Sequence, residues 1–299
     1  MNILIVTTEY YPLGSGIANI VYNCALELRN QGHNCTVISS DAGDIKLPTW
    51  KNIQRFAGIG LISFWNKALR LIKAEHKNFD IIWVHNPLFL RKVKGLSIPI
   101  YSTVHTTYVD RIKLYGSEFN FFTRFYYKSM KVIERLAYKK NKFKTSTTSM
   151  STVPELANIL GKKHRVLYIP NGVDTTKFRA ISESNQRNKT IICVSRIAHQ
   201  KNPYRLVELM HEVHKLDSSI NFKWIGDGLL KKQLEEFISE KQLLGVELVG
   251  KVPYDRIHEQ YQKNEAFILL STYEGQPLAL LEAMACGCVP IISNLPNMT

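Results

Sequence analysis

The sequence predicts an α/β protein with two Rossmann-like halves in tandem, each a parallel sheet covered by helices. Short apolar runs alternate with amphipathic stretches of helical length, which is the rhythm of strand–helix–strand units. The runs are apolar at nearly every position, as strands buried on both faces of a parallel sheet require. The chain has 299 residues, more than one core usually organises, and the rhythm restarts after a polar interruption.

In the first half, runs of apolar or β-branched residues predict strands, and apolar residues that recur every three or four positions predict helices. Gly32 suits the end of the first helix because glycine readily adopts the conformation that closes helices. The expected strands are Asn2–Val6, Cys35–Ser39, Ile81–Val84, Ile100–Val104, Lys144–Thr148 and Val166–Ile169, and the expected helices are Ala18–Asn30, Ile62–His76 and about Phe119–Tyr138.

A cluster of turn-forming and polar residues marks the boundary between the halves. The turn Pro170–Asp174 precedes the polar stretch Ser182–Asn188. We therefore expect an N-terminal domain over residues 1–170, a linker over 171–188 and a C-terminal domain over 189–299. In the second half the expected strands are Thr190–Ser195, Asn221–Ile225, Val246–Leu248, Ala266–Leu270 and Val289–Ile292, and the expected helices are Pro203–Lys215, Leu229–Lys241, Tyr254–Lys263 and Pro277–Met284.

The chain carries a strong positive charge. Its 39 basic and 25 acidic residues give a formal net charge of +14, which favours an anionic partner. No nucleic-acid-binding module is recognisable, so nucleic acid is not an expected partner. The five cysteines lack C-x-x-C spacing, which indicates neither disulfides nor zinc and favours a cytoplasmic protein. Without a signal peptide or an apolar run of about 20 residues, any membrane contact would be peripheral.

Two loops that follow strands are suited to an anionic ligand. In Tyr11–Gly16, glycines would let the backbone approach a ligand at a helix N-terminus, although an ordinary tight turn would look the same. Arg196 and Lys201 follow the first strand of the second half, at the edge where parallel sheets bind ligands. An arginine fork and a lysine point charge suit a diphosphate; a solvated basic loop is the alternative.

A pair of carboxylates brackets a third loop. Glu274 lies on the loop, and Glu282 follows two turns into the next helix, whose first N–H groups would face an anion. Pro277 suits the first turn of that helix, and Gly287 suits its end. Either glutamate alone would be interpreted as a solvated or capping residue.

Taken in order, these motifs resemble the retaining glycosyltransferases of family four, which have the GT-B fold. The resemblance rests on the E-x7-E spacing of Glu274 and Glu282 and on the S-R-x4-K pattern that ends at Lys201. Shorter matches cover nearly the whole chain: Gly14–Gly16, Gln31–His33, Asp80–His85, Ile169–Asp174 with Phe178, and Ile225–Gly228. The resemblance implies an α/β fold of two Rossmann-like parallel-sheet domains that face each other across a cleft. It also implies an incomplete second domain, since relatives continue with a further strand and helices.

The family pattern implies a role for each matching residue. Residues 1–170 would hold the acceptor and residues 189–299 the nucleotide sugar. Arg196 and Lys201 would grip the donor diphosphate. Glu274 would hold the donor sugar and be catalytic, as would His105 at the end of a strand. Glu282 would contact the ribose, and Gly16 would approach the phosphates or the acceptor. Gly14 and His85 would lie on the acceptor side, a structural histidine being the alternative for His85. The other implied contacts to the donor sugar are Gly275, Gln276, Pro277 and Leu278.

Some loop positions depart from the family pattern. Ser195 and Asn202 stand where glycine is usual, and Gly14–Gly16 replaces a more regular glycine pair. We expect altered loop geometry at these places. Gln276 replaces an apolar residue and is expected to contact the donor sugar.

The expected chemistry uses no metal and no other cofactor. Breaking a sugar–phosphate bond leaves negative charge on the diphosphate, which Arg196, Lys201 and helix N–H groups would stabilise. The sequence also has no D-x-D motif. Retention of the anomeric configuration is implied by the family alone.

The expected function is a metal-independent hexosyltransferase. It would transfer a sugar from a nucleotide sugar to a glycan or lipid-linked acceptor, in cell-surface polysaccharide or glycolipid assembly. Two alternatives stay open. One is a soluble transferase that acts on a small sugar phosphate or inositol phosphate, and the other is a nucleotide-sugar-binding protein without turnover owing to truncation.

Much of the positive charge lies in one segment. Arg111–Lys144 holds ten basic and two acidic residues together with a series of phenylalanines and tyrosines. Aromatic side chains at headgroup depth and cations on anionic lipid would dock this helix on the inner face of the cell membrane. The alternative is a helix that packs its aromatic side chains into the N-terminal core.

Overall fold

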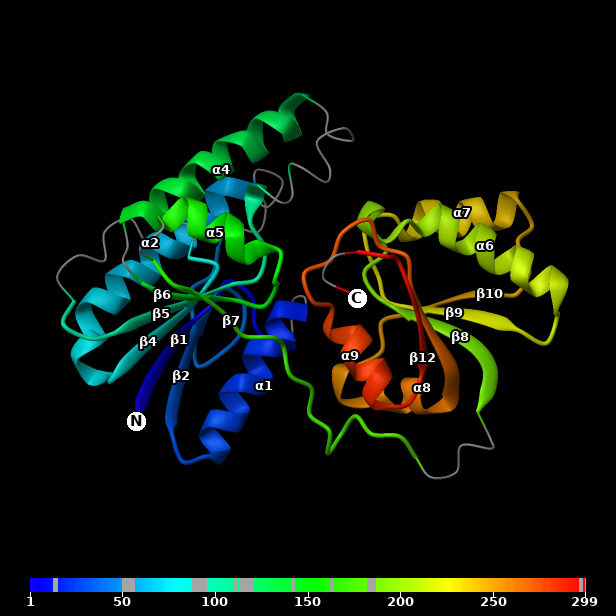
Figure 1. Ribbon diagram of the computed structural model, residues 1–299, viewed down its shortest axis with the longest axis horizontal. Helices are drawn as coiled ribbons and strands as arrows, with labels where there is room; N and C mark the ends of the chain where they lie inside the picture. Colours follow the sequence, from blue (N-terminus) through cyan, green and yellow to red (C-terminus); the bar gives the residue numbers. More distant parts are fainter. Residues whose placement is uncertain are drawn as a thin grey trace. The chain divides into compact units, whose positions relative to one another are not determined.

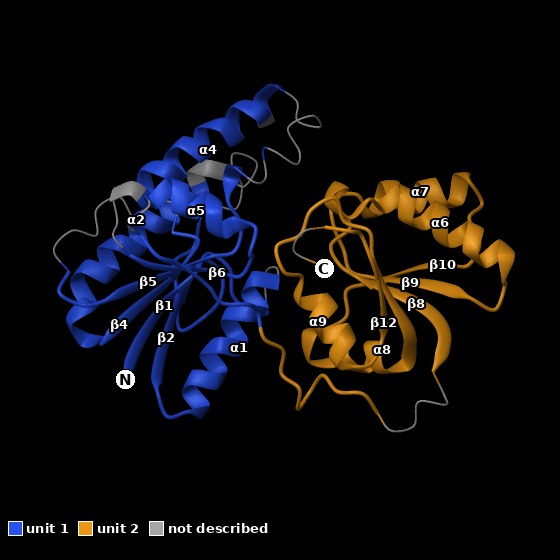
Figure 2. Ribbon diagram, viewed as in Figure 1, with its two compact units in different colours: residues 1–171 blue, residues 172–299 orange. Residues whose placement is uncertain are grey.

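The structure is a computed structural model, and it describes residues 1–12, 16–49, 57–87, 96–109, 112, 121–140, 143–161, 164–181, 187–295 and 298. For residues 57–59, 123, 139 and 140 it describes the backbone alone. The chain forms two compact units, Met1–Asn171 and Gly172–Thr299 (Figure 2). We call them unit 1 and unit 2 and describe each by itself.

Unit 1 contains a seven-stranded parallel sheet in the order β3-β2-β1-β4-β5-β6-β7 (Figure 1). Between β1 and β4 the order reverses, which is the switch point where open parallel sheets bind ligands beyond the carboxyl ends of their strands. The strands are β1 Asn2–Val6, β2 Asn34–Ser39, β3 Ile45–Lys46, β4 Ile81–His85, β5 Ile100–Val104, β6 Lys144–Thr147 and β7 Val166–Tyr168, and the helices are α1 Gly16–Asn30, α2 Ala57–Glu75, η2 His76–Asn78, α4 Phe121–Lys140 and α5 Thr152–Leu160.

Both faces of this sheet are buried. Leu4 of β1 packs with Trp65 of α2 on one face, while the next residue, Ile5, packs with Val21 of α1 on the other. Successive side chains of a strand point to opposite faces, so both must be apolar. This arrangement explains why the strands are continuous apolar runs in the sequence.

The sequence did not indicate two elements of unit 1. β3 has only two residues, too few for a periodic pattern. Helix α5 contains Pro154, which reads as a helix breaker in the sequence. The structure places this proline in the first turn, where a missing N–H removes no helical hydrogen bond.

Unit 2 contains a five-stranded parallel sheet in the order β10-β9-β8-β11-β12, with its switch point between β8 and β11. Helices α6 and α7 cover one face, and α8 and α9 cover the other (Figure 1). The predicted start of the last helix at Pro277 is one residue early, because α9 begins at Leu278. The strands are β8 Asn188–Val194, β9 Asn221–Ile225, β10 Val246–Gly250, β11 Asn264–Leu269 and β12 Val289–Ile292, and the helices are η4 His199–Lys201, α6 Pro203–Leu216, α7 Lys231–Glu240, η5 Tyr254–Arg256, α8 Ile257–Lys263 and α9 Leu278–Ala285.

Helix α4 has an inward face and an outward apolar face. Tyr138 is buried in the core of unit 1, and Tyr126 and Tyr127 are half-buried. By contrast, Phe121 and Phe122 are 79% and 81% exposed. The tyrosines therefore pack inward, as one of the two sequence interpretations expects, whereas the phenylalanines do not. We call the exposed set the outer stripe; it comprises Phe121, Phe122, Phe125, Val132 and Leu136.

A row of basic residues borders the outer stripe along α4. At about 100° per residue, these residues lie on one flank of the helix beside the exposed phenylalanines. We call them the basic stripe; it comprises Arg124, Lys128, Lys131 and Arg135. Of the helices in the described part of the chain, none has the length and apolarity needed to cross a membrane.

Candidate active site

The loop that follows β8 is fixed by the glycine loop that follows β9. A Cβ atom at Gly226 would lie 2.0 Å from the carbonyl oxygen of Ser195, and one at Gly228 would lie 2.2 Å from that of Ile197. Only glycine permits so close an approach of two backbones. The N–H groups of Ser195 and Ile197 also donate to carbonyl oxygens of the glycine loop, at 3.1 and 3.0 Å. The backbone on both sides of Arg196 is therefore held.

Arg196 offers an available cation on this fixed loop. Its side chain is exposed, and its guanidinium forms no ion pair or hydrogen bond with the residues that the structure describes. Because its backbone is held and its head group is not, Arg196 can turn toward an anionic ligand without disturbing the fold.

Lys201 and Glu274, which the sequence assigned to separate motifs, form a buried ion pair. Their side chains are 12% and 8% exposed. Ser271 donates through Oγ to the same carboxylate at 2.5 Å. The amide of Gln200 donates to the carbonyl oxygen of Tyr273 at 2.6 Å. The strand-end loops of β8 and β11 thus meet as one polar cluster at the carboxyl edge of the sheet.

Asn202 explains one departure from the family pattern. Its backbone is left-handed, with φ of 48°, a conformation that glycine adopts freely and that asparagine tolerates better than most residues. Its side-chain amide donates to the carbonyl oxygen of Leu270 at 2.9 Å. Asparagine therefore supplies the backbone geometry of glycine and adds a bond that glycine lacks.

The loop between Glu274 and α9 carries the other residues assigned to the donor sugar. Gly275, Gln276 and Pro277 are half-buried, and Leu278 is the buried first residue of α9. Pro277 has no N–H to offer, so backbone donors in this stretch come from its neighbours.

Glu282 is buried in α9 and is 3% exposed. The hydroxyl of Tyr261 on α8 donates to it at 3.2 Å. Burial raises the pKa of Glu282 to about 7, against the opposing effects of hydrogen bonds from Tyr254 and Tyr261 and the charge of Lys177. The carboxyl group is thus close to its titration point near neutral pH, and it can donate as well as accept a hydrogen bond.

In unit 1, the carboxyl ends of β4 and β5 bring two buried histidines together. Nδ1 of His85 lies 3.0 Å from Nε2 of His105, and the rings are stacked with centroids 5.3 Å apart. Oδ1 of Asn86 accepts the backbone N–H of His105 at 3.0 Å. Burial lowers the pKa of His105 to about 4, and burial together with the neighbouring His105 lowers that of His85 well below its usual value. Both rings are therefore neutral at pH 7.

The histidine pair predicts acid sensitivity of the fold. Unfolding releases His105 to its ordinary pKa near 6.5, so between about pH 6.5 and pH 4 the unfolded chain binds more protons than the folded chain. We expect the free energy of unfolding to fall by about 2 kcal/mol between pH 7 and pH 5 from His105 alone. Urea unfolding at both pH values measures this loss. The variant H85Q/H105Q should lose less stability than the natural chain, and an equal loss in both would contradict the prediction.

The structure describes some of the other residues of unit 1 to which the sequence analysis assigned a role. Gly16 is the exposed first residue of α1, at the carboxyl end of β1. Gly14 lies outside the described residues, as does Arg111. The residues of unit 1 and of unit 2 are each brought together within their own unit: His85 with His105, and Lys201 with Glu274.

Sequence reasoning missed both of these pairings, although a signal existed for the first. β4 and β5 follow each other in the chain, and a histidine stands at or just past the end of each. Parallel strands that are neighbours place their carboxyl ends together. The second pairing joins residues 73 positions apart and depends on how two loops fold, which spacing alone does not encode.

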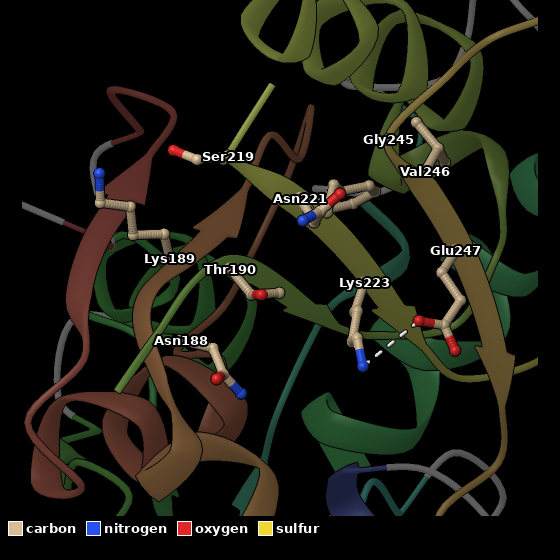
Figure 3. A pocket seen from close by; sticks show the side chains of 10 residues that line it. Asn188, Lys189, Thr190, Ser219, Asn221, Lys223, Gly245, Val246 and Glu247 are labelled. Carbon is tan, nitrogen blue, oxygen red and sulfur yellow. Dashed lines mark ion pairs between the residues drawn. The ribbon is translucent and has the colours of Figure 1, made fainter. Parts of the chain in front are cut away.

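A hollow of about 600 Å³ lies at the opposite edge of the unit 2 sheet (Figure 3). It is lined by residues at the amino ends of the strands, among them Lys189, Asn221 and Lys223. Figure 3 shows Lys223 pointing toward Glu247, with which it pairs at 3.3 Å. This hollow is separate from the polar cluster, and parallel sheets bind their ligands at the other edge.

Two known families together cover nearly the whole sequence. Residues 14–177 match the family described as Glycosyltransferase Family 4, and residues 174–299 match that described as Glycosyl transferases group 1. The chain belongs to glycosyltransferase family 4. This glycosyltransferase is 28% identical to the alpha-monoglucosyldiacylglycerol synthase of Acholeplasma laidlawii, over 98% of its own length and 80% of the relative's.

Solved structures share the fold of this glycosyltransferase. The sucrose-phosphate synthase of Thermosynechococcus elongatus matches with a TM-score of 0.79 and 16% identity, over 98% of this chain and 81% of that one. Anabaena HepE in complex with UDP-glucose matches with a TM-score of 0.69 and 16% identity, over 98% and 80%. The two parallel sheets are those of the GT-B fold, so the fold class and the family expected from the sequence are confirmed.

Proposed function

We propose that this glycosyltransferase transfers a sugar from a nucleotide-diphosphate sugar to a lipid-linked or glycan acceptor, with retention and without a metal. The observation that carries the donor half is the polar cluster of unit 2. Arg196 is exposed on the same loop as Lys201, whose buried pair with Glu274 lies at the edge where parallel sheets bind ligands. A diphosphate would complete the arrangement, since it offers two charges to the two cations.

In this proposal the bound donor separates the ion pair, because Lys201 and Glu274 bind different parts of the donor in place of each other. The diphosphate binds Arg196 and draws Lys201 toward it, while the carboxylate of Glu274 accepts hydrogen bonds from sugar hydroxyl groups. Glu282 contacts the ribose hydroxyls from α9. The titration point of Glu282 near neutral pH makes its affinity for the nucleotide depend on pH between about 6 and 8.

The chemical step breaks the bond between the anomeric carbon and the diphosphate oxygen. The electron pair leaves with the diphosphate, where Arg196 and Lys201 stabilise the added negative charge. The acceptor hydroxyl attacks from the same face, and its proton passes to the departing phosphate oxygen. We propose a catalytic role for His105 as well, whose ring is neutral and contacts His85 and whose backbone N–H is bonded by Asn86.

The acceptor half of the proposal rests on α4 and on the relatives. The Acholeplasma laidlawii relative is a glycolipid synthase by name. In this chain the outer stripe exposes Phe121, Phe122 and Phe125 beside a basic stripe, which is the pattern of an interfacial helix. We propose that α4 docks the enzyme on the cytoplasmic face of an anionic membrane, where a lipid-linked acceptor is available.

A screen of nucleotide sugars tests the enzymatic proposal. Purified protein is challenged with UDP-, GDP-, ADP- and TDP-sugars, first by thermal shift and then by release of the nucleoside diphosphate. One donor should raise the unfolding temperature and be turned over, and addition of EDTA should not reduce the rate. If a donor binds but no sugar is released, the protein binds nucleotide sugars without being an enzyme, and the proposal is wrong.

The phenylalanines of α4 should govern membrane binding. Replacing all three in F121S/F122S/F125S removes exposed apolar side chains, each worth roughly 1.5–3 kcal/mol when buried in lipid. We expect at least ten-fold lower recovery with anionic vesicles in sedimentation. The control L216S/L229S removes two exposed leucines of unit 2 and should sediment as the natural chain does. Equal recovery of both variants would contradict docking through α4.

A further inference from the structure

A second hollow, of about 360 Å³, lies between α4 and α5 in unit 1. The two helices pack beside each other (Figure 1). Helix α4 contributes Lys131 and Arg135 to the lining, and α5 contributes Asn158 and Ile159. We call it the α4–α5 hollow. None of these residues belongs to the histidine pair or to any motif that the family pattern explains.

The two cations of the hollow are not engaged in salt bridges with described residues. Lys131 and Arg135 stand four residues apart on α4, where like charges repel each other. Neither forms an ion pair with a carboxylate in the described part of the chain. Helix α7 shows the contrast, since its lysines at 231 and 232 each face a glutamate one turn on. A bound anion would relieve the repulsion on α4.

The floor of the hollow is apolar. Val109 and Ile159 are buried, at 7% and 3% exposure, and the exposed Pro154 is a third apolar residue of the lining. Polar groups come from the sides: Ser151 and the exposed Asn158 of α5. Cations at the rim over an apolar floor suit an amphiphile better than a simple inorganic ion.

One acidic group also lines the hollow and limits what it can hold. Glu155 accepts a hydrogen bond from Thr107 at 2.8 Å, so the cations outnumber the described carboxylates there by one. The helix end of α5 adds little, because the N–H groups of Thr152 and Val153 already bond carbonyl oxygens of the chain. A ligand would therefore be held by side chains, and one negative charge matches the excess.

We propose that the α4–α5 hollow binds the phosphodiester headgroup of an anionic glycerophospholipid. The phosphate meets Lys131 and Arg135, the headgroup hydroxyls meet Ser151 and Asn158, and the glycerol end lies on the apolar floor. Both cations belong to the basic stripe that borders the outer stripe of α4, so a helix lying in the interface brings the hollow to headgroup depth. This inference rests on the proposed membrane docking and adds a defined lipid site to it.

Titration with a short-chain lipid tests the site without a membrane. The probe is dihexanoyl-phosphatidylglycerol below its micelle concentration, added to the full chain and followed by calorimetry. We expect saturable binding that K131Q/R135Q weakens at least ten-fold. The matched control R124Q/K128Q removes the same charge from the same helix outside the hollow, and it should change binding less than two-fold. N158E, which adds a negative charge from α5, should weaken binding as well.

Several outcomes would overturn the site. Equal losses in K131Q/R135Q and R124Q/K128Q would mean diffuse attraction to the basic stripe. Inorganic phosphate binding as tightly as the lipid would mean a simple phosphate site, and absence of saturable binding would mean none. Donor turnover by the natural chain is measured separately, without lipid. A failed lipid site with turnover intact is thereby distinguished from failure of the proposed function.

Discussion

Replacing Glu274 with alanine is expected to lower donor turnover by at least three orders of magnitude. The carboxylate is the buried partner of Lys201 and the acceptor for Ser271. Its removal leaves a buried ammonium without a counter-charge, and loss of one partner of such a pair costs about 3–5 kcal/mol. Turnover of the donor found in the screen, measured on folded protein, tests this expectation.

Two variants separate the catalytic and structural contributions of Glu274. E274Q keeps the shape of the side chain and a hydrogen bond with Ser271 while removing the charge, so it should fold better than E274A and still fail in turnover. E265A removes an exposed glutamate from β11 and should leave the rate within two-fold. Turnover within three-fold of the natural rate in folded E274A and E274Q would refute a catalytic role.

Replacing Gly226 with alanine is expected to disrupt unit 2. The added Cβ would lie 2.0 Å from the carbonyl oxygen of Ser195, and φ at this position is +148°. Because the clash is with backbone, the loop after β8 must move. Nε1 of Trp224, which donates to the same carbonyl oxygen at 3.1 Å in the natural chain, then loses that hydrogen bond. We expect a loss of more than about 3 kcal/mol of stability, in the range of severe backbone substitutions.

Urea unfolding followed by tryptophan fluorescence checks this loss, since Trp224 is the one tryptophan of the sequence from 172 to 299 and reports on unit 2. G172A serves as the control, since a Cβ there meets nothing within 4 Å and its φ lies outside the left-handed region. If the free energies of unfolding of G226A and G172A differ by less than 1 kcal/mol, the close approach of the two loops does not exist in solution. A surviving G226A protein should also bind the donor more weakly, because Arg196 sits on the displaced loop.

The regular elements could be predicted from the sequence because their signals are local. A buried parallel strand such as β1 must be apolar at each position, and this pattern is visible without a structure. The strand–helix alternation also implied two sheets. Helix α5 was not predicted. It contains Pro154, and the effect of a proline depends on its place in the helix.

The candidate site could be predicted only as a set of residues. The spacing of Glu274 and Glu282 indicated the family, but it did not indicate that Lys201 neutralises Glu274. That contact depends on the left-handed backbone of Asn202 and on hydrogen bonds between distant loops. The pKa shifts of Glu282 and His105 likewise arise from burial, which follows from packing and not from local sequence.

The loops of unit 2 are joined through their main chains as well as through side chains. Ser195 and Ile197 bond the glycine loop through backbone N–H groups, and the N–H of Thr272 bonds the carbonyl oxygen of Gln200. Bonds of this kind do not depend on which side chains the loop tips carry. Arg196, whose guanidinium takes no part in these bonds, can therefore be replaced without unfolding the sheet, and anion binding at this edge can be altered while the scaffold is left untouched.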